Sequence, residues 1–219
     1  MTERVAVREN VLKENDRIAA ALRERFARDR VYCLNLISSP GAGKTSILEG
    51  TLEALGRTRI RAAVLTGDIQ TERDADRLRR YGFPALQITT GGSCHLDAAM
   101  VQRALERLPV DGLDVLFVEN VGNLVCPASY DLGEDAKVVV LSVTEGDDKP
   151  LKYPGIFRRA RVMLLHKMDL LPHVRFDPAA AVADARRVQP DLEVIQTSCV
   201  GAPGLDEWVR WIERRRQEK

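Results

Sequence analysis

The segment SSPGAGKTS, residues 38–46, has the spacing of a phosphate-binding loop, except that Ser38 stands where the pattern has its first glycine. Glycines let backbone N–H groups turn inward around a phosphate chain, Lys44 can reach the terminal phosphates, and the Thr45 hydroxyl can bind Mg²⁺. A plain glycine turn is the alternative, but the loop lies between an apolar strand segment and a helical segment, as nucleotide binding requires. The predicted nucleotide contacts are Pro40, Gly41, Ala42, Gly43, Lys44, Thr45 and Ser46.

Two acidic residues follow other apolar segments of strand length. Asp68 lies in GDIQTERDAD (67–76), and Glu119 lies in FVENVG (117–122), where a Walker B carboxylate would act. Carboxylate oxygens suit Mg²⁺, held directly or through water. Solvated loop acids are the alternative, but both residues are expected beyond the carboxyl ends of parallel strands, where ligands of such sheets bind. We therefore predict Lys44, Asp68 and Glu119 as catalytic residues.

Residues 166–169 read HKMD, where a GTPase normally has NKxD, so His166 replaces the usual asparagine. The two oxygens of Asp169 can accept hydrogen bonds from both the N1–H and the exocyclic amine of guanine, a pair that adenine lacks. The Lys167 side chain can lie along the base. The segment TSCVGAPG (197–204) is expected to place Ser198 and Cys199 against the base. The sequence therefore favours GTP over ATP.

Three further residues could bind a softer metal. Cys94 and His95 are adjacent in GGSCHLDAAM (91–100), and Cys126 follows Glu119 by seven positions. Thiolate and imidazole suit Ni²⁺ or Zn²⁺. We expect a helix to begin at Cys94, which would lower the pKa of its thiol. Three ligands are one short of a closed tetrahedral site, so water or a second subunit could complete it.

The composition is that of a globular protein. The chain has 219 residues, 45% of them hydrophobic and 30% charged, with a formal net charge of +1. That balance gives no electrostatic case for nucleic acid or an anionic membrane, and no apolar run is long enough to span a bilayer. The charged N-terminus does not read as a signal peptide, and the four widely spaced cysteines read as reduced thiols. A cytoplasmic location is expected.

Apolar runs of strand length alternate with helical patterns from residue 31 onward. Runs that are apolar throughout are typical of strands covered on both faces of a parallel sheet. We predict an α/β fold, a doubly wound and mainly parallel sheet of about seven strands, with residues 1–30 as an accessory helix and 31–219 as one P-loop GTPase domain. The expected strands are 31–37, 60–66, 85–90, 114–120, 137–143, 161–166 and 192–198. The expected helices are 8–29, 44–56, 71–81, 94–108, 178–188 and 204–216.

Five segments together resemble one known family. SSPGAGKTS, GDIQTERDADR, GGSCHLDA, ENVGNLVCP and EGDDKPLKYP (145–154) look like those of the hydrogenase nickel-incorporation GTPases, HypB. The resemblance covers nearly all of residues 31–219. It implies a GTPase of the SIMIBI class, P-loop proteins that dimerise across their nucleotides, which hydrolyses GTP to GDP and phosphate. Such a protein helps insert Ni²⁺ into the large subunit of nickel–iron hydrogenase.

The resemblance also implies roles for particular residues and partners. Cys94, His95 and Cys126 match the family's metal site, and Lys149 and Lys152 lie in a segment near the nucleotide and the dimer interface. The implied partners are a second copy of the chain in the GTP state, a HypA-like zinc protein and the hydrogenase large subunit. Because residues 1–30 contain neither Cys nor His, the N-terminal nickel-storage motif of some relatives has no counterpart, and high-affinity nickel storage is not expected.

Three other interpretations compete with this one. A urease-type nickel-chaperone GTPase would share the fold, but its metal motif is of a Cys-Pro-His type, which the Cys94–His95 pair does not match. A non-catalytic metal-binding or storage module could retain a P-loop as scaffold, against which Lys44, Thr45 and the two carboxylates argue. A small-molecule kinase using ATP would need an acceptor site, and none is evident.

Overall fold

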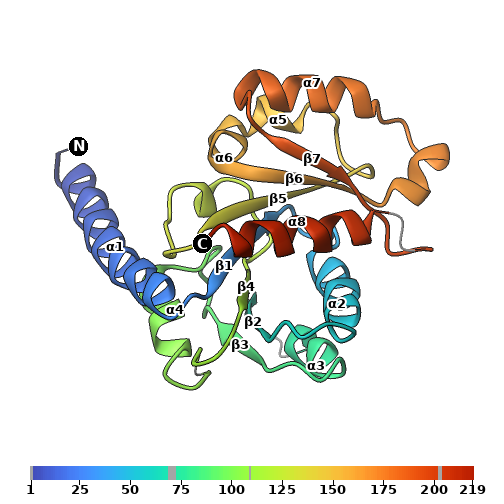
Figure 1. Ribbon diagram of the computed structural model, residues 1–219. Coiled ribbons are helices and arrows are strands. Elements are labelled where there is room, and N and C mark those ends of the chain that lie inside the picture. Colours follow the sequence, from blue (N-terminus) through green and yellow to red (C-terminus); the bar gives the residue numbers. More distant parts are fainter. Residues whose placement is uncertain (1, 69–72, 109, 202–203) are drawn as a thin grey trace.

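The fold is built on a parallel β-sheet (Figure 1). The structure, a computed structural model, describes residues 2–68, 73–108, 110–201 and 204–219, with side chains from residue 10 onward. Within these residues the sheet has seven strands in the order β3-β2-β4-β1-β5-β6-β7, and every neighbouring pair is parallel. The strands are β1 (Tyr32–Ser38), β2 (Ala62–Asp68), β3 (Ala85–Thr89), β4 (Val115–Glu119), β5 (Ala136–Ser142), β6 (Ala160–His166) and β7 (Glu193–Gln196). The predicted fold class is confirmed.

The central strands have the environment that their composition predicts. β1, β4 and β5 are buried at every position, whereas the edge strands β3 and β7 are partly exposed. A strand that is covered on both faces has no place for an alternating polar face, so its sequence reads as a continuous apolar run. The uninterrupted apolar runs of the sequence are therefore explained by helices on both sides of the sheet.

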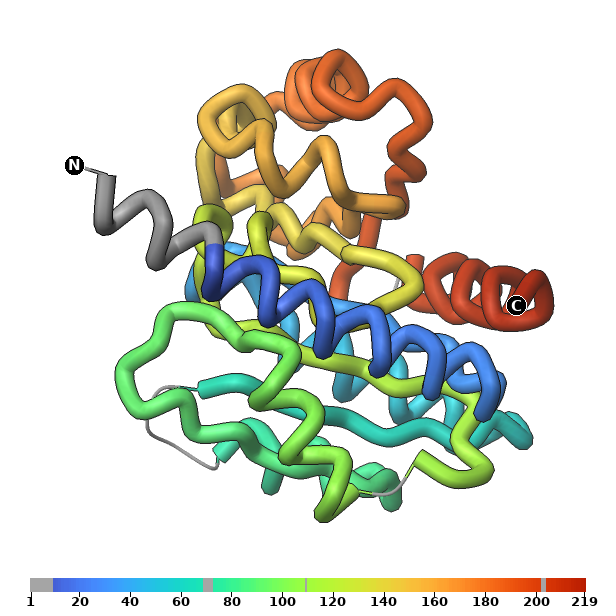
Figure 2. Tube along the Cα trace, turned by 90° about the vertical axis from the view of Figure 1, so that its left-hand side faces the viewer, coloured from blue at the N-terminus to red at the C-terminus, as the bar shows by residue number. Residues whose placement is uncertain are grey.

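Helices cover both faces of the sheet (Figures 1 and 2). The helices α2, α3 and α8 pack on one face. On the other face α1 and α4 cover the half with β2 and β4, and α6 and α7 cover the half with β5 and β6. Their bounds are α1 (Thr2–Arg28), α2 (Lys44–Leu55), α3 (Arg73–Arg79), α4 (Ala98–Ala104), α5 (Lys149–Lys152), α6 (Pro154–Arg159), α7 (Pro178–Val188) and α8 (Leu205–Gln217), with short 3₁₀ helices η1 (Cys126–Ala128) and η2 (Met168–His173).

The C-terminal half of the helix α1 packs against α4. Its residues Ala19, Leu22 and Phe26 are buried in the same core cluster as α4. The buried Asn15 accepts a hydrogen bond from the backbone N–H of Ala98 at 2.9 Å. The division of the chain at residue 30 into an accessory helix and a GTPase domain stays a prediction.

The predicted helix over 94–108 is wrong at both ends, since α4 covers Ala98–Ala104. The helix α4 begins at Ala98, and Asp97 caps it by accepting a hydrogen bond from the backbone N–H of Met100 at 2.7 Å. An aspartate in extended conformation at this position satisfies a free N–H group of the first turn, which fixes where the helix starts. Residues 94–97 therefore form a loop. The helices α5 and α6, between β5 and β6, were not predicted.

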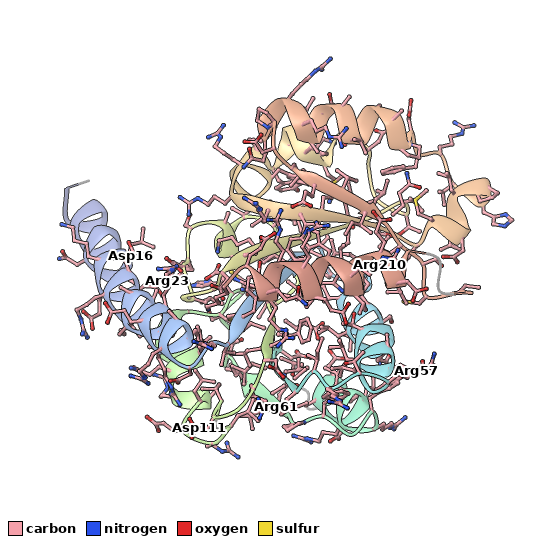
Figure 3. The ribbon with its side chains drawn as sticks, viewed as in Figure 1. Asp16, Arg23, Arg57, Arg61, Asp111 and Arg210 are labelled. Carbon is pink, nitrogen blue, oxygen red and sulfur yellow. The ribbon has the colours of Figure 1, made fainter. Side chains whose placement is uncertain are left out.

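The outer faces of the helices and connecting loops are charged. Figure 3 labels Asp16, Arg23, Arg57, Arg61, Asp111 and Arg210 around the periphery of the molecule, and all six are exposed. In the described part of the chain, we find no helix that combines the length and the apolar character needed to cross a membrane.

Candidate functional site

A cavity of about 500 Å³ lies beyond the carboxyl ends of β1, β2 and β4. The phosphate-binding loop after β1 forms one wall, the end of β2 with Asp68 forms a second, and the end of β4 with Glu119 forms a third. Because β1 lies between β4 and β5, the chain leaves this strand at the point where the strand order reverses, which is where doubly wound sheets bind ligands. The structure thus brings the predicted phosphate residues together with both predicted carboxylates.

Lys44 is held inside this cavity by the end of β1. The residue is buried, with 8% of its surface exposed, and Nζ donates a hydrogen bond to Ser38 Oγ at 2.9 Å. Burial lowers the pKa of Lys44, and the nearby carboxylate of Glu119 opposes that effect. Ser38, which departs from the P-loop pattern, therefore has a local use, because its hydroxyl accepts from the lysine and donates to the carbonyl of Ser39.

Thr45 and Glu119 are linked across the cavity. Thr45 Oγ1 donates to Glu119 Oε1 at 2.7 Å, and the other carboxylate oxygen of Glu119 is buried without a hydrogen-bond partner among the residues that the structure describes. Burial raises the pKa of Glu119 to about 7, and the charge of Lys44 works against this shift. A buried acceptor that lacks a partner costs free energy unless a ligand or water satisfies it. Oxygen ligands at this position fit a hard divalent cation such as Mg²⁺.

Two residues of α3 line the same cavity and were not predicted as contacts. Arg77 forms an ion pair with Glu49 of α2, with Nη2 2.6 Å from Oε2, and its Nη1 lies 3.3 Å from Asp74 Oδ1. Asp74 was expected on this helix, and it is there. No sequence pattern indicated a role for Arg77, because an arginine in a charged helix is usually a solvated side chain. Residues 69–72 of the predicted GDIQTERDAD segment lie outside the described residues.

The predicted base residues lie at the ends of β6 and β7. Ser198 Oγ donates to Asp169 Oδ1, and Lys167 Nζ donates to the carbonyl of Gly41 at 2.7 Å. Lys167 has a φ of +62°, in the left-handed region that few non-glycine residues adopt. It lines the cavity, whereas Asp169, Ser198 and Cys199 are not among its lining residues. Residues 202–203 of the predicted base loop lie outside the described part.

His166 is enclosed behind the base residues. Its Nδ1 lies 2.9 Å from Thr197 Oγ1, its Nε2 lies 3.7 Å from Cys199 Sγ, and 2% of the residue is exposed. The ring also packs on Gly43, where a Cβ atom would come within 2.6 Å of His166 Cδ2. Burial lowers the pKa of His166 to about 4, and the adjacent Lys167 charge adds to this. The imidazole is therefore neutral at pH 7 and joins the phosphate loop to the base loop.

Lys149 reaches the phosphate loop from α5. Its Nζ lies 3.3 Å from Ser39 Oγ and 3.4 Å from Glu145 Oε2. Lys152, one turn further on, is exposed and pairs with Asp148 at 2.6 Å. Of the two lysines implied by the family resemblance, the structure therefore places Lys149 beside the phosphate loop.

The three predicted soft-metal residues come together on neighbouring loops. One possible ligand atom from each of Cys94, His95 and Cys126 lies within 4.8 Å of the other two. Cys94 Sγ is 3.2 Å from Cys126 Sγ and 3.9 Å from His95 Nδ1. Cys94 is exposed, and the other two are partly exposed. Thiol and imidazole groups at these distances are a donor set for Ni²⁺ or Zn²⁺.

The predicted electrostatic effect on Cys94 is wrong. Because α4 begins at Ala98, no helix N-terminus lies at this thiol, and its pKa is raised by the neighbouring Cys126 thiol and by partial burial. Burial lowers the pKa of His95, which keeps its ring neutral as a ligand requires, although Asp97 opposes the shift. The ring of Tyr130 packs against that of His95 in a tilted arrangement, with centroids 3.9 Å apart and 34° between the ring planes. Tyr130 carried no sequence signal, because only the fold brings it to His95.

The other two cysteines lie apart from the cluster of Cys94, His95 and Cys126. Cys33 is fully buried within β1, and burial raises its pKa well above the ordinary value. Cys199 contacts His166 and does not join the Cys94 cluster.

The fold and the cavity define a class. A doubly wound parallel sheet whose first strand runs into a glycine loop with a buried lysine, opposite a carboxylate at the end of a neighbouring strand, is the architecture of a P-loop nucleoside triphosphatase.

Comparison with known proteins narrows the class to a family. A family model described as CobW/HypB/UreG, nucleotide-binding domain, matches residues 33–196. The chain is 56% identical over 214 residues to hydrogenase maturation factor HypB of Azotobacter chroococcum mcd 1, covering 97% of this chain and 69% of the relative. It is 53% identical to that of Escherichia coli strain K12, covering 94% and 71%. The crystal structure of HypB from Helicobacter pylori in complex with nickel has a TM-score of 0.89 at 39% identity, covering 94% of this chain and 96% of that one. The chain belongs to the CobW/HypB/UreG family and, within it, to the HypB hydrogenase maturation factors.

Proposed function

We propose that the chain is a GTP-hydrolysing metallochaperone that delivers Ni²⁺ during the maturation of nickel–iron hydrogenase. The names of its relatives and the nickel bound in the Helicobacter pylori structure support this role. The observation that carries the proposal is the position of the cluster of Cys94, His95 and Cys126. One of its thiols lies seven residues beyond Glu119, which lines the cavity at the phosphate loop.

In this proposal the phosphate loop binds the nucleotide through the backbone of residues 40–46 and the ammonium of Lys44. Thr45, Glu119 and Asp68 hold Mg²⁺, which supplies positive charge against the β- and γ-phosphates. The unpartnered buried oxygen of Glu119 supports this assignment. Phosphoryl transfer depends on positioning and on charge stabilisation, and the pre-placed Lys44 and Glu119 suit both.

Guanine is recognised by Asp169, with Lys167 along the base and Ser198 and Cys199 behind it. Ser198 already donates to one oxygen of Asp169, so the carboxylate is oriented before the base arrives. Lys149 adds a cation next to Ser39 at the start of the phosphate loop.

The metal cluster binds Ni²⁺ as cargo. Two thiols and one imidazole leave at least one coordination position for water or a donor from another protein. Its exposure on the surface gives a second copy of the chain, a HypA-like zinc protein or the hydrogenase large subunit access to the metal. We propose that GTP favours a homodimer and that Zn²⁺ competes for the same donors.

The test combines two measurements on the wild-type protein. Turnover of GTP and of ATP is compared with and without Ni²⁺, and Ni²⁺ and Zn²⁺ are titrated in the presence of GDP or a non-hydrolysable GTP analogue. We expect GTP to be the preferred substrate and the metal affinity to differ between the two nucleotide states. Metal binding without any turnover would favour a storage module, and equal turnover of ATP would contradict the guanine site.

A further inference from the structure

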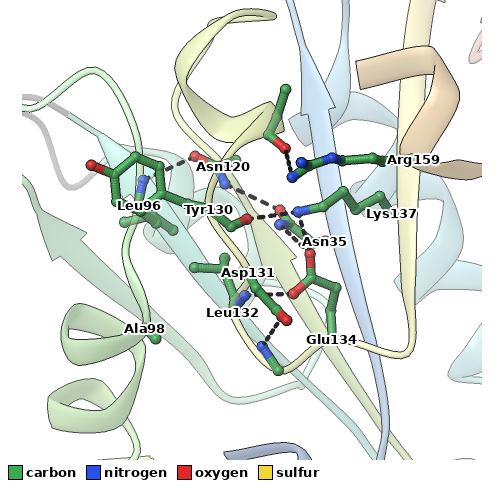
Figure 4. Close-up of polar contacts among 12 residues, drawn as sticks. Asn35, Leu96, Ala98, Asn120, Tyr130, Asp131, Leu132, Glu134, Lys137 and Arg159 are labelled. Carbon is green, nitrogen blue, oxygen red and sulfur yellow. Dashed lines mark hydrogen bonds and ion pairs between the residues drawn. The ribbon is translucent and has the colours of Figure 1, made fainter. Parts of the chain in front are cut away.

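A buried chain of polar side chains lies on the face of the sheet that α1, α4, α6 and α7 cover (Figure 4). It separates the two hydrophobic clusters on that face. On β1, Cys33 belongs to one cluster and Ile37 to the other, and between them Asn35 faces the same side. Asn35 and Asn120 are both fully enclosed, with 0% and 1% exposed. Polar groups in such a place persist only when they are hydrogen-bonded, so the arrangement restricts how the segments around it can sit.

Asn120 links the end of β4 to residues 94–97, the loop that carries Cys94 and His95 and is called the metal loop below. Its Oδ1 accepts from the backbone N–H of Leu96 at 3.1 Å and of Val121 at 3.0 Å, and its Nδ2 donates to Asn35 Oδ1 at 3.2 Å. Leu96 follows the metal-cluster residue His95 directly. The backbone just after His95 is therefore attached to the strand end that carries Glu119 (Figure 4). Further along the same segment, Asn123 Nδ2 donates to the carbonyl of Cys94 at 3.2 Å.

The same polar chain reaches His95 from a second side. Asn35 Nδ2 donates to Glu134 Oε1 at 3.2 Å, and Glu134 pairs with Lys137 at 2.5 Å. Lys137 Nζ donates to the carbonyl of Tyr130 at 2.7 Å, and the Tyr130 ring packs against His95 at a tilt. Both the backbone after His95 and one face of its ring thus depend on groups connected through Asn120 and Asn35.

Close packing joins these segments to the nucleotide cavity. A Cβ atom on Gly122, two residues beyond Asn120, would lie 2.8 Å from Pro40 Cα of the phosphate loop. A Cβ atom on Gly67, just before Asp68, would lie 2.8 Å from the side chain of Leu96. A displacement of the β2 end therefore also displaces Leu96, and a displacement of the phosphate loop also displaces the segment after Asn120, because there is no free space between them.

We propose that Asn120 is the positioning residue through which the nucleotide state sets the affinity of the metal cluster. When the γ-phosphate changes the position of the β4 end, the Asn120 Oδ1 bond carries the change to Leu96 and hence to His95 relative to Cys126. The inference rests on the proposed function, since it needs a nucleotide and a metal bound to these two sites. Cys126 is reached along the chain itself, whereas Leu96, next to His95, is reached through this buried hydrogen bond and Cys94 through the more exposed bond from Asn123.

The experiment measures a ratio of two dissociation constants in the 219-residue chain. Ni²⁺ alone is titrated in the GDP state and in the state with a non-hydrolysable GTP analogue, and the two dissociation constants are divided. Coupling between sites typically amounts to a ratio of about 5 to 150. We expect Asn120→Ala to bring the ratio to within about twofold of one, and to abolish to the same extent the effect of Ni²⁺ on affinity for the analogue, because coupling is reciprocal.

Asn15→Ala is the matched control. Asn15 is also a buried asparagine beside the metal loop, and its two bonds, to the N–H of Ala98 and the carbonyl of Asp131, are both 2.9 Å long. It is anchored on α1 and has no bond to the β4 end, so its loss should lower stability but leave the ratio at the wild-type value. Asn120→Ser serves as a second variant, because its side chain is too short to reach Leu96 N but retains a hydroxyl for the buried site.

The outcomes separate the inference from the function on which it rests. If a folded Asn120→Ala or Asn120→Ser protein has the same ratio as the wild type, the role of Asn120 is overturned while the proposed function stays intact. Equal loss of the ratio in Asn15→Ala also overturns it, because general loosening then explains the effect. If the wild-type protein itself has a ratio of one, nucleotide-controlled metal binding is contradicted, and the inference fails with it.

Discussion

The phosphate site and the metal cluster lie at the same end of the sheet, but their side chains are held very differently. Lys44 and Glu119 are buried at strand and helix ends, and each already has a hydrogen-bond partner in Ser38 or Thr45. Cys94 and Cys126 lie on loops, partly or fully exposed, and contact each other. Preset polar groups favour a chemical step because they need not reorganise during it. An exposed and incomplete ligand set suits a metal that must arrive and leave.

The largest effect on activity should come from a change in the phosphate site, whose side chains are already held in place. Lys44→Ala removes one of the few fixed cations at the phosphates, and the loss of a single such group costs about 10²–10³-fold in turnover. GTP hydrolysis should fall by at least about 100-fold, measured as phosphate release. Arg57→Ala, an exposed cation just beyond the far end of α2, is the control and should keep wild-type turnover. Near-normal hydrolysis by a folded Lys44→Ala protein would refute the phosphate-loop assignment.

The second effect should be confined to metal binding at the exposed cluster. Cys94→Ala/Cys126→Ala removes two of three donors, and we expect Ni²⁺ affinity to fall by more than about 100-fold, since even weaker outer-shell changes cost 10–100-fold. Basal GTP hydrolysis should stay within a few-fold of wild type, because neither thiol lines the nucleotide cavity. Equilibrium dialysis measures the metal, and Cys199→Ala, a cysteine outside the cluster, should retain it. Nickel binding that survives the double change would contradict the site.

The difference between the two regions also explains what the sequence could predict. The phosphate loop and the carboxylates at strand ends are read from short local patterns, because the strand before each residue fixes where it goes. The metal residues could be selected by type, and the structure brings them together. Their electrostatics could not be predicted, because Asp97 moves the helix start past Cys94 and exchanges a helix N-terminus for a neighbouring thiol.

Residues that act through contacts distant in sequence had no readable signal. Asn120 stands next to Glu119 in the sequence, yet its partner Asn35 is 85 residues away and Leu96 is 24 away. Tyr130 meets His95 only because β5 returns beside β1. Arg77 lines the cavity from a helix that reads as solvent-facing. Such pairings follow from strand order and register, which composition and periodicity do not specify.

A third prediction tests how tightly the base side is held compared with the metal loop. Burial and the Lys167 charge lower the pKa of His166 to about 4 from its ordinary 6.5. Between these values the unfolded chain takes up a proton and the folded protein does not, so stability falls as the pH is lowered through that window. From pH 7 to pH 5 this contributes a loss of about 2 kcal/mol in the free energy of unfolding.

His166→Asn removes the titrating group from this comparison. Urea unfolding at pH 7 and pH 5 should show a loss on acidification that is smaller in the variant than in the wild type by about 2 kcal/mol. The difference between the two proteins isolates this residue, because the other titrating groups are shared. An identical pH dependence in both would mean that the imidazole is not enclosed as the structure shows.

The smallest expected effect concerns the specificity of the base site, which like the phosphate site is arranged before the ligand binds. Asp169→Asn replaces an acceptor carboxylate held by Ser198 with an amide that can accept only one of guanine's two hydrogen bonds. A hydrogen bond to a charged group is worth about 1.5–3 kcal/mol, so even the low end gives about a tenfold loss of GTP affinity. Xanthosine triphosphate, whose base has an oxygen in place of the exocyclic amine, should bind better to the variant than to the wild type, and competition against a fluorescent GDP analogue measures both. Asp206→Asn, on the exposed first turn of α8, is the control and should leave both affinities unchanged. Asp169 does not recognise the base if the wild type binds ATP as well as GTP, or if Asp169→Asn leaves the preference between GTP and xanthosine triphosphate unchanged. In that case the ordered side chains at this end of the sheet serve only to hold the phosphate loop through His166 and Lys167.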